Sequence, residues 1–336
     1  MTEKRLELVC PAGGLPSLNA AVDNGADCVY AGFRNETNAR NFTGLNFDEA
    51  SLAEGIRYAR RRGARVFLAL NTYPTSANWT RWTAAVDRAA QLGVDAVILA
   101  DLGLMEYAAE AHPRLPLHLS VQASATNYEA INFYRERFGV KRAVLPRVLS
   151  LAQVGEVVAN TPVQIEVFGF GGLCVMVEGR CALSAYATGE GPNCTGACSP
   201  GKAVRWEQTP AGMETRLNGV LVDRFADGAR TGYPPIFKGR SRVGEHTYYA
   251  IEEPASLNTL ELLPELVRIG VRAIKIEGRQ RSPAYVAQVT RVWREAIDRC
   301  LGDPTRFAVS PVWMAELNRG SEGQAHTLGA YNRPWK

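Results

Sequence analysis

The sequence predicts a single eight-stranded β/α barrel, and three features of the 336-residue chain support that prediction. Short apolar runs alternate with amphipathic helical stretches, as expected for strands buried on both faces of a parallel sheet. Eight such strand-like runs can be counted along the chain. The length suits about 250 residues of barrel plus one insertion. A doubly wound open sheet alternates in the same way and is the alternative architecture.

The expected strands are short, are rich in Val, Ile, Leu or Ala, and are mostly bounded by Gly, Pro, Asn or Asp. They span Leu6–Cys10, Cys28–Gly32, Arg65–Leu70, Ala96–Ala100, Leu117–Val121, Arg142–Leu145, Ile165–Gly169 and Ala273–Glu277. Asp48 and Ser150 are expected to cap the helices that follow them. The expected helices span Asp48–Arg62, Thr80–Leu92, Leu104–Ala111, Glu129–Phe138, Leu151–Ala159, Leu260–Ile269 and Tyr285–Cys300.

The regular alternation breaks between residues 170 and 254, where Gly, Cys, Pro and Thr are frequent. A hairpin is expected there, pairing Val204–Gln208 with Glu214–Leu217. We therefore expect residues 1–303 to form one barrel domain, with 170–254 as a cysteine-rich insertion after the seventh strand. Residues 304–336 are expected to form a C-terminal cap. An insertion at that point leaves from the barrel face where such enzymes place their chemistry.

Composition narrows the classes of function. The net charge of +4 is slight for this length and does not predict nucleic-acid binding by the whole surface, although a local patch remains open. No apolar stretch approaches the roughly 18 residues of a transmembrane helix, so stable membrane insertion is not expected. The first residues lack the apolar core of a signal peptide. We expect a cytoplasmic protein, in which cysteines serve metal binding or catalysis more often than disulfides.

Four of the seven cysteines fall within 25 residues, at Cys174, Cys181, Cys194 and Cys198. Soft thiolates in such numbers suit an iron–sulfur cluster or zinc. Structural zinc sites usually carry paired, tightly spaced cysteines, and only Cys194 and Cys198 are that close. The spacing therefore favours iron–sulfur over zinc. Four unrelated reduced thiols are the third interpretation.

Several long stretches resemble one family. The chain is similar over nearly its whole length to the collagenase-like (U-type) peptidase family of bacterial barrel proteins, and most closely to its ubiquinone-biosynthesis branch. The stretches that carry this resemblance are Leu8-Val9-Cys10-Pro11-Ala12-Gly13, Thr37-Asn38-Ala39-Arg40-Asn41-Phe42, Ser120-Val121-Gln122-Ala123-Ser124, Val144-Leu145-Pro146-Arg147, Cys174-Val175-Met176-Val177-Glu178-Gly179-Arg180-Cys181, Gly196-Ala197-Cys198-Ser199-Pro200 and Ile276-Glu277-Gly278-Arg279.

The resemblance implies an activity other than proteolysis. Proteins of this branch carry a [4Fe–4S] cluster on four cysteines and form a heterodimer with a paralogous barrel of the UbiV type. Together they support oxygen-independent hydroxylation of the ubiquinone ring, with prephenate as the oxygen donor. A lipid-carrier protein that presents the quinone precursor is a further expected partner. Other members of the family hydroxylate RNA bases with the same kind of donor.

The expected cluster ligands are only partly matched. Cys174, Cys181 and Cys198 stand at the first three ligand positions of the family, but Phe237 occupies the fourth, and phenylalanine cannot bind iron. Three arrangements stay open. Cys194 could serve as a tentative fourth ligand, the cluster could keep three thiolates and an open iron, or the cluster could be lost.

Four polar residues near expected strand ends are candidates for substrate binding. Prephenate carries two carboxylates, which Arg147 and Arg279 could bind in fork geometry after the sixth and eighth strands. Gln122 and Asp101 could orient a substrate by hydrogen bonds, or each could instead cap the next helix. The acidic residues Glu166 and Glu277 are expected to pair with arginines.

Rival functions remain within the same fold. An RNA-base hydroxylating enzyme should carry a strongly basic groove. A zinc peptidase of the common type should carry His-Glu-x-x-His, and the four scattered histidines form no such motif. A subunit whose cluster is structural, with the chemistry in its partner, is the third rival.

Overall fold

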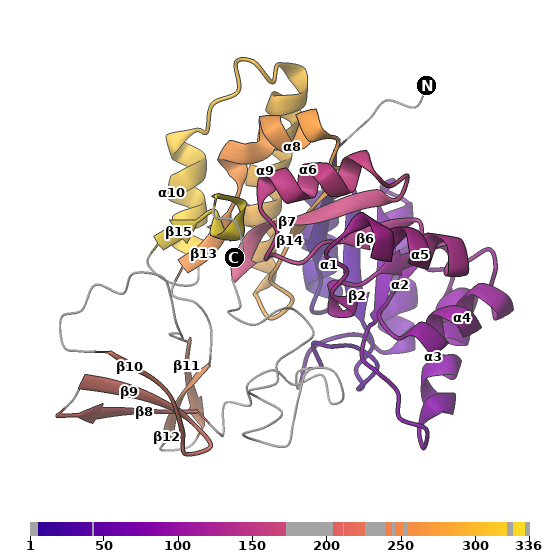
Figure 1. Cartoon of the computed structure of the whole chain (residues 1–336), viewed down its shortest axis with the longest axis horizontal. Coiled ribbons are helices and arrows are strands. Elements are labelled where there is room, and N and C mark those ends of the chain that lie inside the picture. Colours follow the sequence, from indigo (N-terminus) through magenta and orange to yellow (C-terminus); the bar gives the residue numbers. More distant parts are fainter. Residues whose placement is uncertain are drawn as a thin grey trace.

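Eight parallel strands close into a barrel, as the sequence predicts (Figure 1). The computed structural model describes residues 6–41, 44–172, 204–210, 212–225, 239–243, 246–250, 255–320 and 325–332. Pairing of the last barrel strand with both the first and the seventh closes the ring, which excludes the doubly wound open sheet. The barrel strands are β1 (Glu7–Pro11), β2 (Cys28–Gly32), β3 (Arg65–Leu70), β4 (Ala96–Leu99), β5 (Leu117–Leu119), β6 (Arg142–Val144), β7 (Gln164–Gly172) and β14 (Ala273–Ile276).

Helices pack around the outside of the barrel (Figure 1). The side chains of Asp48 and Ser150 accept hydrogen bonds from the backbone N–H groups of Ser51 and Gln153, which confirms both expected N-caps. The helices around the barrel are α1 (Leu15–Asp23), α2 (Glu49–Arg60), α3 (Trp79–Leu92), α4 (Leu102–Ala111), α5 (Tyr128–Phe138), α6 (Leu151–Ala159), α8 (Leu263–Ile269) and α9 (Pro283–Gly302).

Smaller elements complete the described chain. The expected hairpin is confirmed, since β8 (Val204–Thr209) pairs antiparallel with β9 (Gly212–Leu217). The expected helix over 260–269 begins instead as a 3-10 turn, η3 (Leu260–Leu262), before α8. The other elements are η1 (Val121–Ala123), β10 (Val220–Phe225), β11 (Gly239–Val243), β12 (His246–Ala250), β13 (Ala255–Asn258), α10 (Pro311–Gly320), β15 (Ala325–Thr327) and η4 (Gly329–Asn332).

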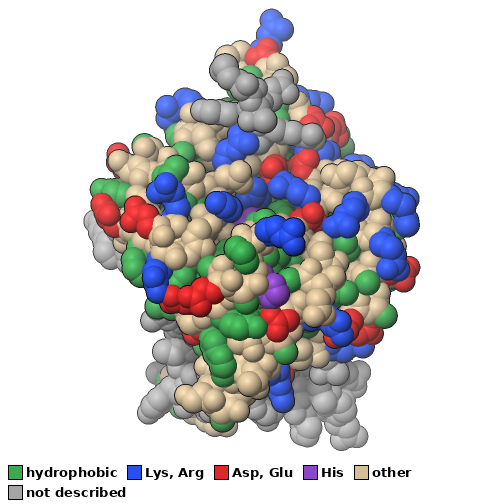
Figure 2. Space-filling view, turned by 90° about the vertical axis from the view of Figure 1, so that its right-hand side faces the viewer, with side chains coloured by type: hydrophobic (Ala, Val, Ile, Leu, Met, Phe, Trp, Pro, Cys, Tyr) green, Lys and Arg blue, Asp and Glu red, His purple; other side chains and the backbone are tan. Residues whose placement is uncertain are grey.

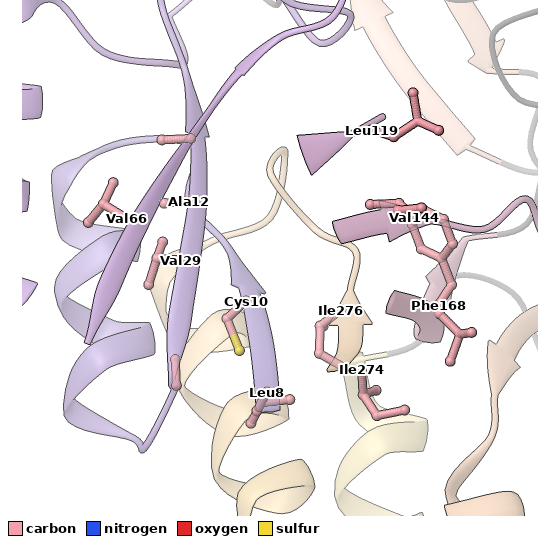
Figure 3. Packing of buried hydrophobic residues seen from close by; sticks show 14 of the residues in the cluster. Leu8, Cys10, Ala12, Val29, Val66, Leu119, Val144, Phe168, Ile274 and Ile276 are labelled. Carbon is pink, nitrogen blue, oxygen red and sulfur yellow. The ribbon is translucent and has the colours of Figure 1, made fainter. Parts of the chain in front are cut away.

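An apolar layer between the strands and the helices forms the main core, part of which Figure 3 shows. Leu8 and Ile274 point outward from adjacent strands into this layer. Cys10 belongs to the same layer, where its sulfur lies 3.2 Å from the Thr290 hydroxyl of α9. Burial raises the pKa of the Cys10 thiol to about 12, so this cysteine packs as a neutral thiol.

The barrel interior combines a small apolar cluster with buried charges. Glu166 is 1% exposed and lies 2.8 Å from the ammonium of Lys275 and 3.3 Å from the guanidinium of Arg142. Arg142 also reaches Glu7 at 2.5 Å, and Arg65 reaches the same carboxylate at 2.7 Å. Glu166, Lys275 and Arg142 therefore each have an opposite charge beside them, which is the condition for keeping charges in a core.

We predict that Glu166→Gln destabilises the protein by about 3 kcal/mol, because two buried cations lose their shared carboxylate. Chemical denaturation followed by circular dichroism measures the effect. The matched control is Glu265→Gln, which removes an exposed carboxylate paired with Arg268 and should shift the denaturation midpoint little. An equal shift for both variants would contradict this account of the interior.

The same carboxylate predicts a pH dependence. Burial alone would raise the pKa of Glu166, but Lys275 and Arg142 outweigh it and hold the pKa below the usual 4.5. The stabilisation that ionised Glu166 gives the folded state is then complete above pH 4.5 and is lost as the pH falls through the lowered pKa. We expect the stability difference between the native chain and Glu166→Gln to shrink in acid, as measured by denaturation at stepped pH. A difference that grows in acid would reverse the assigned sign.

Candidate functional site

The candidate site lies at the carboxyl ends of the barrel strands, under a loop that joins β2 to α2. Asn71, just after β3, accepts a hydrogen bond at 3.0 Å from the backbone N–H of Ala39 in this loop. The amide of Asn71 also donates to the Ser120 hydroxyl at 3.0 Å. The loop is thereby tied to the ends of two strands, so its backbone and the strand ends form one polar layer.

Arg279 is buried beneath this loop. Its side chain follows β14, and the residue is 8% exposed. One guanidinium nitrogen donates to the side-chain oxygen of Asn38 at 3.2 Å, and the guanidinium carbon lies 5.6 Å from the centre of the Tyr30 ring. Desolvation lowers the pKa of Arg279 to about 10, which still leaves it charged at neutral pH.

Arg147 follows β6, and its guanidinium lies flat on an aromatic ring. The guanidinium carbon is 3.5 Å from the centre of the Phe168 ring, and the side chain is 7% exposed. A carboxylate oxygen of Glu277 lies 2.5 Å from one of its nitrogens. Together with the contact between Arg142 and Glu166, this pair confirms that both acidic residues meet arginines.

The Arg279 guanidinium carbon lies 5.6 Å from the centre of the Tyr30 ring, and Arg147 pairs with Glu277, two residues before Arg279. Burial raises the pKa of the Tyr30 hydroxyl, and Glu277, Arg279 and Arg147 all act electrostatically on that hydroxyl. The hydroxyl donates to the Ile276 carbonyl at 2.9 Å. Two guanidinium groups thus share a buried, aromatic-lined region at the strand ends. Such a region can bind an anion that carries several negatively charged oxygens.

The other two candidate residues occupy different surroundings. Asp101 accepts a hydrogen bond from the backbone N–H of Leu104 at 2.8 Å, so it caps α4, the alternative that the sequence left open. It also lines an open cavity of about 480 Å³ beside Pro74 and Trp79. Gln122 lies in η1, just after β5, and is 4% exposed.

The expected cluster ligands Cys174, Cys181, Cys194 and Cys198 lie outside the described residues, as does Phe237. The described chain stops at Gly172, the last residue of β7, two residues before Cys174. Within the described ranges, no three His, Cys, Asp or Glu side chains are placed to hold a metal ion. The three cysteines that the structure does describe, Cys10, Cys28 and Cys300, are buried thiols.

Sequence reasoning did not assign Tyr30, Phe168 or Asn38 to the site. The alternation of inward and outward side chains along β2 could have placed Tyr30 inside the barrel. Asn38 carries no comparable signal, because it reaches Arg279 only through the path of an irregular loop. Its position inside the Thr37–Phe42 stretch was the sole indication.

The charged surface is mixed where Figure 2 shows it. Lys and Arg side chains on this face are interspersed with Asp and Glu, and no continuous basic groove is visible there. Of the helices in the described ranges, none has the length and apolar character needed to cross a membrane.

Gly32 leaves the space in which Asn38 and Arg279 meet. A Cβ at position 32 would lie 2.6 Å from the side-chain carbonyl carbon of Asn38 and 2.8 Å from a guanidinium nitrogen of Arg279. We predict that Gly32→Ala displaces this pair and makes Arg279 several times more reactive toward phenylglyoxal, measured by peptide mass spectrometry. Gly302→Ala is the matched control, because no atom lies within 4 Å of its added Cβ. Unchanged labelling of Arg279 in Gly32→Ala would contradict the packing.

Comparisons with known proteins place the chain in a family. The model of peptidase family U32 matches residues 13–334. The tRNA hydroxylation protein P1 of Bacillus subtilis is 31% identical over 320 residues, covering 94% of this chain and 68% of that protein. The tRNA hydroxylation protein P of Escherichia coli is 33% identical over 319 residues, covering 87% and 68%. The 23S rRNA 5-hydroxycytidine synthase of Escherichia coli is 30% identical over 301 residues, covering 89% and 40%. The resemblance of the sequence motifs to the U-type peptidase family is confirmed, and the chain belongs to peptidase family U32.

Proposed function

We propose that this chain is the iron–sulfur subunit of an oxygen-independent hydroxylase that adds a hydroxyl group to the ring of a ubiquinone precursor. One structural observation carries the binding part of the proposal. Arg147 and Arg279 are both buried at the strand ends of the barrel, near the point where β7 leads toward the cysteine-rich segment. Strand ends are where barrel enzymes hold their substrates.

Hydroxylation is supported by the relatives. Three similar proteins are named for hydroxylating tRNA or for making a hydroxycytidine in rRNA. What those names share with the proposed reaction is the addition of a hydroxyl group. The choice of a ubiquinone precursor rests on the sequence stretches that resemble the ubiquinone-biosynthesis branch of the family, among them Ser120–Ser124 and Ile276–Arg279.

The buried arginines suit prephenate as the oxygen donor. A dicarboxylate can place one carboxylate on Arg279 and the other near Arg147, each through charge-assisted hydrogen bonds. The Phe168 ring fixes the plane of the Arg147 guanidinium, and Asn38 fixes one nitrogen of Arg279. Both groups are therefore oriented before a ligand arrives, which reduces the ordering cost of binding. Burial excludes water and strengthens these contacts.

A [4Fe–4S] cluster fits the donor set that the chain offers. Thiolates are the usual ligands of such clusters, and the sequence supplies Cys174, Cys181 and Cys198 with Cys194 as the tentative fourth. Bound there, the cluster would carry single electrons away from the ring toward an external acceptor, or would offer an open iron as a Lewis acid. A UbiV-type paralogous barrel and a lipid-carrier protein are the proposed partners, the first forming the heterodimer and the second presenting the quinone precursor.

We expect the chain, purified without oxygen, to contain iron and to absorb in the visible cluster band. Cys174→Ser and Cys194→Ser should both lose iron, Cys174→Ser more severely, because sulfur ligation is removed. The matched control Cys300→Ala changes a buried thiol of α9 and should keep the native iron content. Iron analysis and the absorption spectrum report the outcome. Native iron content in Cys174→Ser would refute the assignment of the motif.

Hydroxylation of an RNA base is the second candidate, because the names of the relatives favour it. The two candidates separate in a strain that lacks this chain and grows without oxygen. We expect its ubiquinone to disappear while its hydroxylated nucleosides stay at native levels, both measured by mass spectrometry. Loss of a hydroxylated nucleoside with ubiquinone intact would select the RNA reaction instead.

Complementation of the same strain tests the arginines. Arg279→Met should lower ubiquinone by at least about tenfold, because a buried cation that binds the donor is lost. Arg268→Met, which alters an exposed arginine of α8, is the control and should restore ubiquinone fully. Full restoration by Arg279→Met would remove this residue from the proposed site.

A further inference from the structure

Gln122 carries a buried acceptor that the described protein does not use. The residue is 4% exposed, and its side-chain oxygen is covered without a hydrogen-bond partner among the described residues. Most buried polar atoms in folded proteins have a partner, and an unpaired one destabilises the fold. An unpaired acceptor next to a candidate site therefore needs an explanation.

The backbone at Gln122 is fixed on two sides. Its N–H donates to the Ser120 hydroxyl at 3.2 Å, and its carbonyl accepts a hydrogen bond from the Tyr73 hydroxyl at 3.0 Å. The Ser120 hydroxyl is held in turn by Asn71. These contacts tie the residue to the ends of β3 and β5. Because the backbone is held in this way, the Gln122 side chain has limited freedom to rotate toward solvent.

Gln122 and the arginines follow neighbouring or nearby strands. β5 pairs directly with β6, and Arg147 comes three residues after β6 ends. Gln122 comes three residues after β5 ends. Both side chains therefore belong to the same end of the barrel, where substrates bind in this fold. Asn71 contacts both Ser120, which binds the Gln122 backbone, and Ala39, the neighbour of the Arg279 partner Asn38, so hydrogen bonds link Gln122 to the loop that covers Arg279.

We propose that Gln122 is a specificity-determining residue whose side-chain oxygen accepts a hydrogen bond from an O–H or N–H group on the ring of the acidic compound that the two arginines bind, the proposed oxygen donor. The inference rests on the proposed function and adds to it the kind of ring that the site selects. The ring carries a hydrogen-bond donor, in addition to the acidic group that the arginines bind. A ring without that donor leaves the acceptor unpaired and is discriminated against.

Two variants of the full chain, prepared without oxygen, should change the melting temperature in opposite directions. Gln122→Met has a similar shape and no acceptor, so the melting temperature should rise by roughly 2 °C as an unpaired buried polar atom is removed. Gln164→Met is the control at the other end of the barrel, where the side-chain oxygen accepts from Arg142 at 2.8 Å. Its melting temperature should fall, because a used acceptor is removed.

The binding probes are para-hydroxybenzoate, which has the donor, and para-methoxybenzoate, which lacks it. The native chain and Gln164→Met should bind the hydroxy compound about tenfold more tightly than the methoxy compound, measured by calorimetry. Gln122→Met should bind both equally. Arg279→Met should weaken both probes alike, because both carry the carboxylate.

The outcomes separate this inference from the proposed function. Equal binding of the two probes by the native chain, or a preference that survives in Gln122→Met, overturns the role of Gln122 and leaves the arginine site standing. Binding that Arg279→Met does not weaken overturns the arginine site. If neither probe binds, the proposed arginine site is refuted. In that case, a lower melting temperature for Gln122→Met than for the native chain also refutes the inference that the Gln122 oxygen is unpaired.

Discussion

The seam between β7 and β14 is the constraint on which the rest of this structure depends. These two strands close the barrel, and Lys275 of β14 meets Glu166 of β7 across them in a buried ion pair. The pair is shared with Arg142 of β6, so three consecutive strands of the ring are joined by charges that water cannot screen. A register shift at this seam would separate the charges and leave them buried alone, which gives the closure a strong preference for one alignment.

The seam also assembles the candidate site. At the carboxyl ends of these two strands, the backbone N–H of Glu277 donates to the Phe170 carbonyl at 2.8 Å. A Cβ at Gly171 would lie 2.5 Å from the Cβ of Glu277, so the close approach of the two chains depends on glycine there. Arg279 leaves β14 at the same end at which β7 leads toward Cys174. Barrel closure thus places the Arg279 side chain at the same end of the barrel as Gly172, where β7 ends.

Much of the barrel could be predicted from the sequence, because buried parallel strands are short, apolar and regularly spaced. β2 and β3 match their predicted bounds, as does α6. Pro16 lies in the first turn of α1, a position in which proline is favourable. Pro264 explains why η3 precedes α8, since a helix tends to begin, and not to continue, at proline. β13 and β15 are short strands outside the ring, and such strands have no distinct periodicity.

The charged part of the candidate site was predictable for a similar reason. Arg147 and Arg279 follow strands, and the carboxyl ends of parallel strands meet at one end of a barrel. The aromatic and amide residues around them could not be assigned, because their contacts are set by loop paths and side-chain directions. Sequence alone also could not show that Gln122 keeps an unpaired oxygen, since that depends on every neighbour at once.

The origin of the added oxygen atom tests the central claim most directly. The chain and its proposed barrel partner would be combined without dioxygen, together with the quinone precursor, a two-electron acceptor and prephenate labelled with ¹⁸O at its hydroxyl group. The account predicts that the oxygen added to the ring is ¹⁸O, so the product is 2 mass units heavier than the product made with unlabelled prephenate. A hydroxylated ring without the label would contradict prephenate as the donor, and an unmodified ring would contradict the assignment of this chain to ring hydroxylation.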